Sequence, residues 1–412
     1  MDIVGQQSWI TKIEELVKTF NPEKEEERWK KMSIYQIPEF SKELKEKAFT
    51  PQVASFGPYH YGKHNLKLIE DYKQKVLLHF LKRAGKPLRD FVKAMEDTVE
   101  DLQPCYQGLQ DTQWKDKYKF VRLMISDGCF MLEILRLNPD KPGDSGYTDH
   151  DPIFSVHGAH HKLPYIKRDM LMLENQIPLL VLKVLLQVEA GQTTKPLLSD
   201  KEINRLVFKF CGQGGRCHVE TLGLHVLDVC RQSMIQRPHG SRIAPPYYEG
   251  EPMFTAAQLR ESGVRFKKSG TNYITDISFD KGILTLPSIV VDDITECMLL
   301  NLMAFEHLHV GVGNEITSYV CFMNELVDTA MDVHLLHANH IIHSALGSNK
   351  AVAELFNSIT KDIILDPNSD LGIVREEVNR YCKKRHVKWP ALALAFATVL
   401  LVPAILHIVY KL

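Results

Sequence analysis

The amino-acid sequence predicts a mainly α protein: a large helical domain, a small antiparallel β insert at about residues 263–292 and one C-terminal transmembrane helix. Three observations predict this fold. Apolar residues recur at helical spacing through most of the 412-residue chain. Short β-branched segments separated by glycine gather in the insert. A stretch of 22 residues near the C-terminus contains no Lys, Arg, Asp or Glu.

Residues 1–33 are predicted to form an amphipathic helix followed by a charged segment. Ser8 can cap this helix, and its apolar face is formed by Ile10, Ile13, Leu16, Val17 and Phe20. The Asn-Pro pair at 21–22 ends the helix. The mixed charge run EKEEERWKK at 23–31 predicts a solvated helix face.

Residues 34–388 are predicted to form one helical domain of one or two lobes. Two polar segments rich in Pro, Gly and Asp, at 138–162 and 237–252, predict long surface loops. Apolar stripes predict helices at 66–84, 91–102, 114–137, 163–188, 201–210, 219–232, 295–309, 315–344, 351–361 and 371–384. Strands are predicted at 264–266, 274–279 and 283–291.

Residues 389–410 are the predicted transmembrane helix, which would be about 33 Å long against a hydrocarbon thickness of ~30 Å. A buried core helix is the alternative. Trp389 and Tyr410 stand at its two ends, where interfacial aromatic residues belong. Basic residues gather before the span, whereas only Lys411 follows it. The positive-inside rule therefore predicts a cytosolic N-terminal domain and a single-pass C-terminal anchor, in the plasma membrane or endoplasmic reticulum. The N-terminus does not resemble a signal peptide.

Composition excludes several protein classes. The 50 Lys and Arg against 51 Asp and Glu give a formal net charge of −1, which argues against a nucleic-acid partner. Hydrophobic residues make up 44% and charged residues 25%, as in ordinary globular proteins. A mean hydropathy of −0.17 leaves no room for a polytopic channel.

Two motifs match catalytic or nucleotide-binding patterns incompletely. Residues 57–63 match GxxxxGK, but His64 replaces the Ser or Thr that would bind Mg²⁺. Pro58 lacks an N–H and bulky aromatic residues crowd the loop, so we interpret it as a packed turn and expect no nucleotide. The GDSG sequence at 143–146 matches a serine protease nucleophile segment, but it lies in a polar loop without a rigid scaffold.

Histidines form two clusters. One repeats at every third residue, with His340 able to share a metal ion with either neighbour, but no third ligand beyond Asp332 is evident. Its members are His334, His337, His340 and His343. The other, in the predicted loop, comprises His157, His160 and His161. We interpret the first as a half-exposed helix face and expect no metal ion.

The segment LENQIP at 173–178 interrupts a long apolar helix with three polar residues. Buried polar side chains must be hydrogen-bonded, so these are expected to bond main-chain groups freed by Pro178 or to tie two helices together. An active-site carboxylate at Glu174 is the alternative, although a single Glu without a visible partner is weak evidence for acid–base catalysis.

Eight cysteines are scattered through the chain without a CxxC pair, which predicts reduced core thiols. Cys382 differs because it lies in a basic stretch seven residues before Trp389. It could remain unmodified or carry a palmitoyl group.

Several long segments, in order, resemble a plant family known as domain of unknown function 247. They are residues 34–38 (IYQIP), 56–62 (FGPYHYG), 127–133 (DGCFMLE), 169–178 (DMLMLENQIP), 257–266 (AQLRESGVRF), 279–287 (FDKGILTLP) and 301–306 (NLMAFE). The resemblance runs from about residue 34 to the C-terminal span. It implies a largely helical fold, a C-terminal membrane anchor and no established activity. It also implies a link to plant reproduction, since some members are implicated in self-incompatibility or in suppression of female organ development.

We therefore expect a plant membrane-anchored protein that works by recognition or regulation through contacts with an unknown protein partner, and that is not an enzyme. Its other expected partner is the lipid bilayer, through residues 389–410. No catalytic residue, cofactor or metal ligand is assigned. The alternative is an undescribed hydrolase-like enzyme that uses Glu174 or the histidine clusters.

Overall fold

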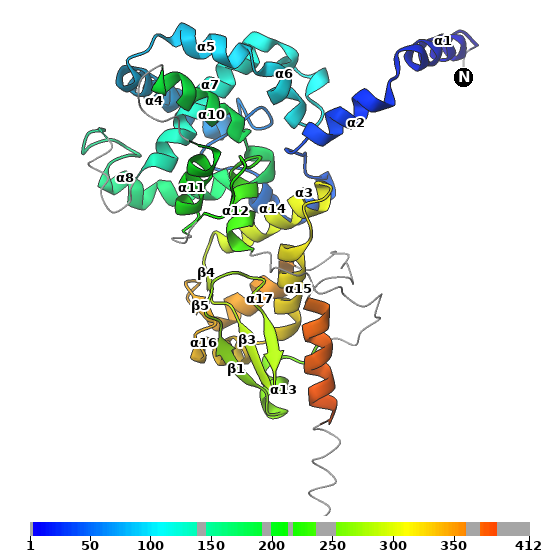
Figure 1. The fold of residues 1–412 in the computed structure, drawn as a ribbon, viewed down its shortest axis with the longest axis vertical. Helices are drawn as coiled ribbons and strands as arrows, with labels where there is room; N and C mark the ends of the chain where they lie inside the picture. The colour runs from blue at the N-terminus through cyan, green and yellow to red at the C-terminus, as the bar shows by residue number, and fades with distance from the viewer. Residues whose placement is uncertain are drawn as a thin grey trace, which may run out of the picture.

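A computed structural model describes residues 3–137, 146–191, 199–212, 217–235, 253–359 and 371–384. Within these ranges the chain is mainly helical with two small sheets, which confirms the predicted class. Figure 1 shows the helices from α3 to α12 in the upper half of the molecule, and the sheets with α13 and α15 to α17 in the lower half. Helix α14 (Thr295–Leu308) lies between them and packs against α3, α12, α15 and α17.

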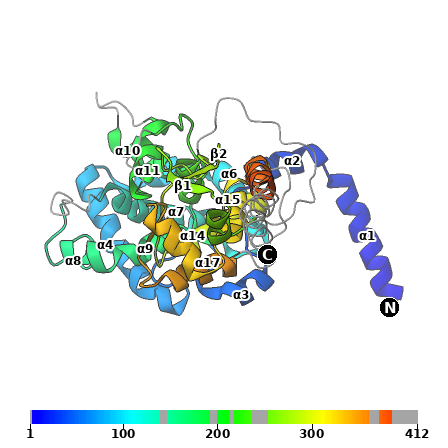
Figure 2. The same ribbon diagram turned by 90° about the horizontal axis from the view of Figure 1, so that it is seen from below.

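An arm made of α1 (Ile3–Thr19) and α2 (Pro22–Lys31) extends away from this body (Figures 1 and 2). Asn21 caps α2, because its side-chain oxygen accepts hydrogen bonds from the N–H groups of Glu23 and Lys24 at 2.9 and 3.2 Å. No residue of α2 is buried, which confirms the predicted solvated helix. The expected start of the first helix at Ser8 is wrong, because α1 already begins at Ile3.

The upper half is built around α7 (Lys117–Arg136), which α4, α5, α10 and α11 cover. Nearly every residue from Phe120 to Leu135 is buried, so this helix is the centre of the core rather than a surface helix with one apolar stripe. The other α-helices of this half are α3 (Glu39–Phe49), α4 (Lys67–Ala84), α5 (Leu88–Glu96), α6 (Val99–Leu102), α8 (Val156–His161), α9 (Leu163–Met170), α10 (Leu179–Ala190), α11 (Asp200–Phe210) and α12 (Val226–Met234). Short 3₁₀ turns cover His64–Leu66, Gln103–Cys105, Leu109–Asp111, Gln113–Lys115 and Leu173–Asn175.

The lower half contains α13 (Ala256–Glu261), α15 (Glu315–Leu326), α16 (Ala330–Ala338) and α17 (Asn349–Ile359). Its strands are β1 (Arg265–Lys268), β2 (Ser278–Asp280), β3 (Ile283–Leu286), β4 (Ile289–Val291) and β5 (Ile342–Ser344). A further helix over residues 371–384, as predicted, packs along the sheet. Its Tyr381 ring contacts Phe279 edge-on at 5.4 Å.

The predicted antiparallel insert is only partly right. Strands β2 and β3 form an antiparallel hairpin, but β1 runs parallel to β3, so the three-stranded sheet is mixed. Lys281 and Gly282 both adopt positive φ, 48° and 81°, as a two-residue hairpin turn requires. Strand β4 leaves this sheet and pairs in parallel with β5, more than 50 residues later in the chain.

Four predicted elements are divided or bounded differently in the structure. The predicted helix at 315–344 splits into α15, α16 and β5, because an apolar run does not by itself distinguish helix from buried strand. The predicted helix at 163–188 breaks already at Leu171, well before Pro178. The predicted loop at 138–162 contains α8, whose cap Ser155 accepts from the N–H of Gly158 at 3.1 Å. The predicted helix at 219–232 begins only at Val226.

The predicted span at 389–410 and the predicted loop at 237–252 lie outside the described residues. Among the residues that are described, no single helix is long and apolar enough to cross a membrane. One pair, Leu163–Met170 with Leu173–Ala190, passes that test together but is bent by 105°.

Candidate functional site

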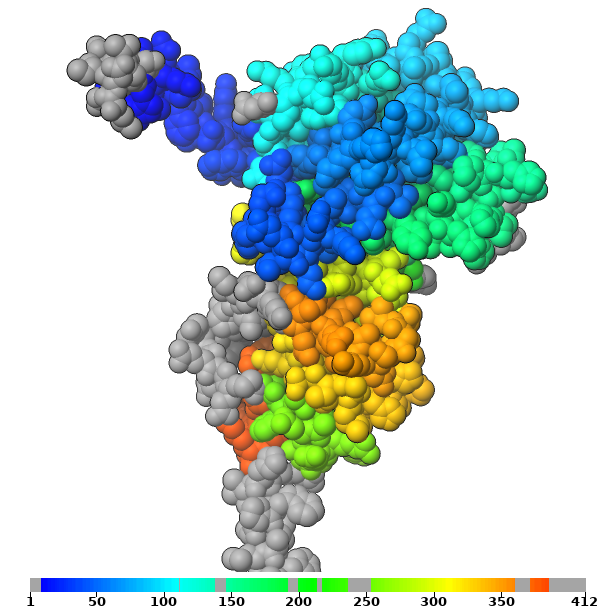
Figure 3. Space-filling model, turned by 180° about the vertical axis from the view of Figure 1, so that it is seen from behind, coloured from blue at the N-terminus to red at the C-terminus, as the bar shows by residue number. Residues whose placement is uncertain are grey.

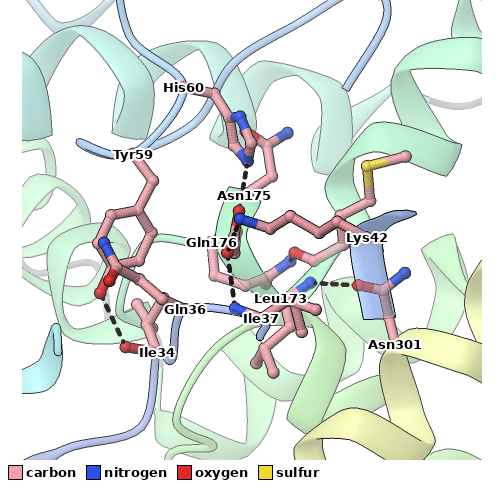
Figure 4. A network of polar contacts seen from close by, with 12 residues as sticks. Ile34, Gln36, Ile37, Lys42, Tyr59, His60, Leu173, Asn175, Gln176 and Asn301 are labelled. Carbon is pink, nitrogen blue, oxygen red and sulfur yellow. Dashed lines mark hydrogen bonds and ion pairs between the residues drawn. The ribbon is translucent and has the colours of Figure 1, made fainter. Parts of the chain in front are cut away.

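The LENQIP segment lies in the interior, where α9 ends and α10 begins. Glu174, Asn175 and Gln176 are all buried, and Pro178 sets the extended approach to α10. Figure 4 shows that side chains from distant parts of the chain converge on this segment. We call this set of contacts the polar clasp, because it joins residues 34–60, 169–178, 227 and 301.

Glu174 occupies one side of the polar clasp. Its Oε1 accepts a hydrogen bond from the N–H of Ile37 at 2.6 Å and lies 2.8 Å from Nζ of Lys42. Its Oε2 lies 3.2 Å from Nε2 of His60. Burial raises the pKa of Glu174, but the contacts with His60, Lys42 and Ile37 outweigh it and lower the pKa below its ordinary value. The carboxylate is thus ionised and occupied by these three groups.

His60 faces Glu174 from the loop at 57–63, which the sequence predicts to be a packed turn. Its side chain is 4% exposed, and burial holds its pKa below the ordinary value. The approach of Nε2 to Glu174 is close but does not have hydrogen-bond geometry, and within the described residues Nδ1 also has no hydrogen-bond partner. A neutral imidazole of lowered pKa beside an ionised carboxylate is a pair that could share a proton, and neither residue lines the groove described below.

Asn175 fixes the loop before His60. Its Oδ1 accepts from the N–H of Phe56 at 2.7 Å, and its Nδ2 donates to the carbonyls of Ala54 and Asp169 at 2.9 Å. Asp169 in turn accepts from three consecutive N–H groups of the same loop, those of Gln52, Val53 and Ala54. Asp169 and Asn175 thus bond the main-chain groups of residues 52–56, as a neighbouring strand would do in a sheet.

Gln176 and Asn301 complete the polar clasp. Gln176 donates to the carbonyls of Met170 and Met172 at 2.6 and 2.7 Å and accepts from the N–H of Leu227. Asn301 of α14 accepts from the N–H of Leu173 at 2.9 Å (Figure 4). Of the two roles expected for LENQIP, tying distant helices and loops together describes these residues. The main-chain groups that their side chains bond belong to residues 37, 54, 56, 169, 170, 172 and 227, and are not groups freed by Pro178.

A buried ion pair, which sequence reasoning missed, lies next to the polar clasp. Lys73 of α4 is fully buried and donates to Asp127 of α7 at 2.7 Å, to Glu70 at 2.5 Å and to the Ser55 carbonyl at 2.6 Å. Asp127 also accepts from the N–H of Gly57 at 2.8 Å. Burial raises the pKa of Asp127 to about 6, against the opposing charge of Lys73.

Gly57 is therefore not part of a phosphate loop. Its φ is 72°, and a Cβ there would lie 2.6 Å from the carbonyl oxygen of Gln176. The N–H groups of residues 56 and 57, which a phosphate loop would leave free, are taken by Asn175 and Asp127. The Tyr59 hydroxyl lies 2.7 Å from the Gln107 carbonyl, and Tyr61 packs edge-on to Trp114, as expected for a packed turn.

A second buried ionic cluster, also missed, joins the two halves. Arg231 of α12 donates through Nε to Glu306 of α14 at 2.8 Å and also contacts Glu315 of α15. Glu306 accepts from the N–H groups of Ile316 and Thr317 at 2.9 and 2.8 Å, so it caps the start of α15. Each of these groups serves to hold helices together.

His225 is the third group that the sequence did not single out. It is fully buried, its Nδ1 accepts from the N–H of Asp228 at 3.1 Å, and its Nε2–H donates to the Ser33 carbonyl at 3.0 Å. Protonation of His225 at Nδ1 would place a second N–H opposite the N–H of Asp228, so this contact disfavours the charged imidazole. Burial accordingly lowers the pKa of His225 to about 4.

The lowered pKa of His225 predicts that the protein loses stability in mild acid. The unfolded chain protonates this imidazole below about pH 6.5, whereas the folded chain does so only near pH 4. The free energy of unfolding should therefore fall by about 3 kcal/mol as the pH drops through that window. Urea unfolding of the full chain between pH 7 and 4.5 measures it. His225→Asn keeps a capping oxygen without the titration, so its pH dependence should be flatter; parallel curves for the two proteins would contradict the assignment.

The histidine clusters do not form a metal centre among the residues that the structure describes. The repeat does not lie on one helix, because α16 ends at Ala338, His340 has a φ of 59° and His343 belongs to β5. The rings of His340 and His343 are 6.3 Å apart. In the other cluster, His157 and His161 lie one turn apart on α8 with ring centres 4.5 Å apart, and no third ligand joins them there.

Most of the GDSG motif lies outside the described residues. All eight cysteines are free thiols. Cys382 is fully buried, so a palmitoyl group could attach only if the helix over 371–384 moved away from its neighbours.

A groove opens on the surface between α3 and α14. Its volume is about 980 Å³, and its lining is mostly apolar, including Phe40, Leu44 and Phe49 of α3 and Leu300, Met303 and Leu308 of α14. Helix α3 is kinked at Lys45, whose backbone is not helical and whose Nζ donates to Glu296 at 2.5 Å and to Ser358 at 3.1 Å. Phe40 and Leu44 lie before the kink and remain 65% and 62% exposed.

Comparisons with known proteins return one family. Residues 34–400 match the family model DUF247, described as a plant protein of unknown function. A UPF0481 protein of Arabidopsis thaliana is 29% identical over 384 residues, which cover 85% of this chain and 77% of that protein. A putative UPF0481 protein of the same plant is 23% identical over 478 residues, with 90% and 86% covered. No solved structure gives a significant match.

Proposed function

The chain belongs to the DUF247 family of plant proteins of unknown function, and we propose that it is a membrane-anchored recognition protein that acts through protein–protein contacts. The observation that carries this proposal is the apolar stripe of α1, which we define as Trp9, Ile10, Ile13, Leu16 and Val17 of the helix together with Phe20 directly after its end. Each of these side chains is 40% to 68% exposed on an arm that stands clear of the body (Figure 3).

The spacing of the apolar stripe suits a helical recognition element. Trp9, Ile13, Leu16 and Phe20 recur at intervals of four, three and four residues, which is the anchor pattern of helices that bind in grooves. Six such side chains form an apolar patch on the order of 600 Å², at the upper end of what monomeric proteins expose. Such patches commonly mark interaction sites.

The membrane anchor in this proposal rests on residues 389–410, whose uncharged sequence is long enough to span a bilayer. The stripe itself does not favour a lipid ligand, because the polar face of α1 carries Lys12, Glu14, Glu15 and Lys18 and so has no net positive charge. A protein partner is therefore the better match.

The hydrolase alternative is less favoured by the geometry. Glu174 is 3% exposed and both its oxygens already face partners of this chain. A substrate would have to displace Lys42 or His60 to reach the carboxylate. The histidine clusters offer pairs rather than a base with an orienting carboxylate.

Proximity labelling in plant cells tests the proposal. The full chain carries a biotin ligase at its N-terminus, and the control carries the same ligase on residues 386–412 alone. We expect the full chain to sediment with carbonate-washed membranes and to label a reproducible set of proteins that the control does not label. A labelled set equal to that of the control, or a full chain in the soluble fraction, would count against the proposed function.

A further inference from the structure

The apolar stripe of α1 and the α3–α14 groove are two uncovered apolar surfaces on one chain. The stripe is convex and has helical anchor spacing, whereas the groove is concave and lies between two helices. Met303, which lines the groove, has a flexible side chain that adapts well to an inserted ring. The two surfaces are complementary in chemistry, which raises the question of whether they meet within one chain or between two.

An α1 that folds back along a fixed α2 would not place the stripe in the groove of its own chain. α2 is held at its end by the ion pair of Lys31 with Asp101 at 2.7 Å and by the bonds of the next residues to the Cys105 carbonyl. α2 is about 15 Å long and the stripe about 17 Å, so α1 folded back at Asn21 would lay the stripe beside α2. That neighbour is charged and has no buried residue. The groove begins only at Ile37, beyond the end of α2.

We infer that the partner of the apolar stripe is a second copy of this chain: each copy inserts α1 into the α3–α14 groove of the other. This inference rests on the proposed function, because it names the protein that α1 recognises. A two-fold dimer of this kind covers both surfaces on both copies through one repeated contact. It would bury roughly 2,400 Å² if each groove contributes as much as each stripe, which exceeds the ~1,600 Å² of a standard stable interface.

The kink in α3 has a role in this arrangement. Lys45 is tied to Glu296 of α14 and to Ser358 of α17, so the second part of α3 is fixed to the body. The first part, with Phe40 and Leu44, lies before the kink and lines the groove in which α1 would lie. Leu44 is thus the groove residue whose replacement by a charge should most directly exclude the helix.

Site-specific photo-cross-linking of the full chain tests the inference. Two differently tagged copies are expressed together in plant cells, and one carries p-benzoylphenylalanine in place of Phe20. We expect cross-links from this position to residues 37–49 or 300–310 of the other copy, in a product of twice the chain mass. Leu44→Asp in the receiving copy should lower the yield at least fivefold, whereas Leu78→Asp on the exposed side of α4 should not.

The other outcomes overturn the inference in different ways. Cross-links from α1 to α1, to the same copy or to another protein would each exclude the exchanged dimer; the last would leave the proposed recognition function standing. Cross-links to lipid alone, or to nothing, would contradict the recognition function as well. The probe in place of Leu68, which is 84% exposed on α4, gives the background.

Discussion

Lys73→Met is expected to destabilise the protein by about 3–5 kcal/mol, because it leaves Asp127 buried without its cation. The Ser55 carbonyl loses its donor at the same time. Since Asp127 also holds the N–H of Gly57, the loop from Gly57 to His60 should loosen with it. Thermal unfolding of the full chain should show a melting temperature lower by on the order of 10 °C.

Two variants sharpen this prediction. Lys75→Met removes an exposed lysine from the same helix and should change stability by less than about 0.5 kcal/mol. Lys73→Met combined with Asp127→Asn keeps an oxygen for Gly57 but removes the unpaired charge, so it should be more stable than Lys73→Met alone. A double variant whose loss equals the sum of the two single losses would show that the pair does not act as a unit.

Glu174→Ala is expected to destabilise the protein by about 2–4 kcal/mol, because the Ile37 N–H and the Lys42 ammonium lose their buried acceptor. Glu174→Gln keeps one accepting oxygen and should lose about half as much. The folded-state pKa of Glu174 is lowered, so its contribution is present above about pH 4.5 and is lost as the pH falls below it.

Urea unfolding of the full chain at pH 7 measures these differences, with Glu43→Ala on the exposed face of α3 as the matched control. The buried Trp114 provides a fluorescence signal from the upper half. Wild-type stability in Glu174→Ala would mean that the polar clasp does not hold the segments that it joins.

The sequence was sufficient for the helical class and for many helices, but not for the contacts between distant segments. The stripe at 66–84 predicted α4 because period and length agree there. Strand β5 was missed because its partner β4 lies more than 50 residues away, and local apolar character cannot show such pairing. The break at Leu171 was missed for a similar reason. Asn301 accepts a hydrogen bond from the N–H of Leu173, and the N–H of Leu227 donates to Gln176; both partners are remote in the sequence.

The candidate site was predictable only in part. Three polar residues in an apolar run marked LENQIP as unusual, but Glu174 meets Ile37 and His60 across more than 110 residues of sequence. Lys73 carried a usable signal, because it lies at helical spacing with Ile69, Val76 and Phe80 on the buried face of α4. A lysine on an apolar stripe requires a buried anion, and Asp127 within the apolar α7 was its matching signal.

We propose that this protein works through a recognition surface, while Glu174 and the polar clasp maintain the fold. Proximity labelling with the N-terminal ligase tests it most directly when wild type, Glu174→Gln and the stripe variant Ile13→Asp are compared at equal folded amounts. The account predicts that Glu174→Gln labels the wild-type set of proteins and that Ile13→Asp loses most of it. Loss of that set in Glu174→Gln with retention in Ile13→Asp would contradict the account.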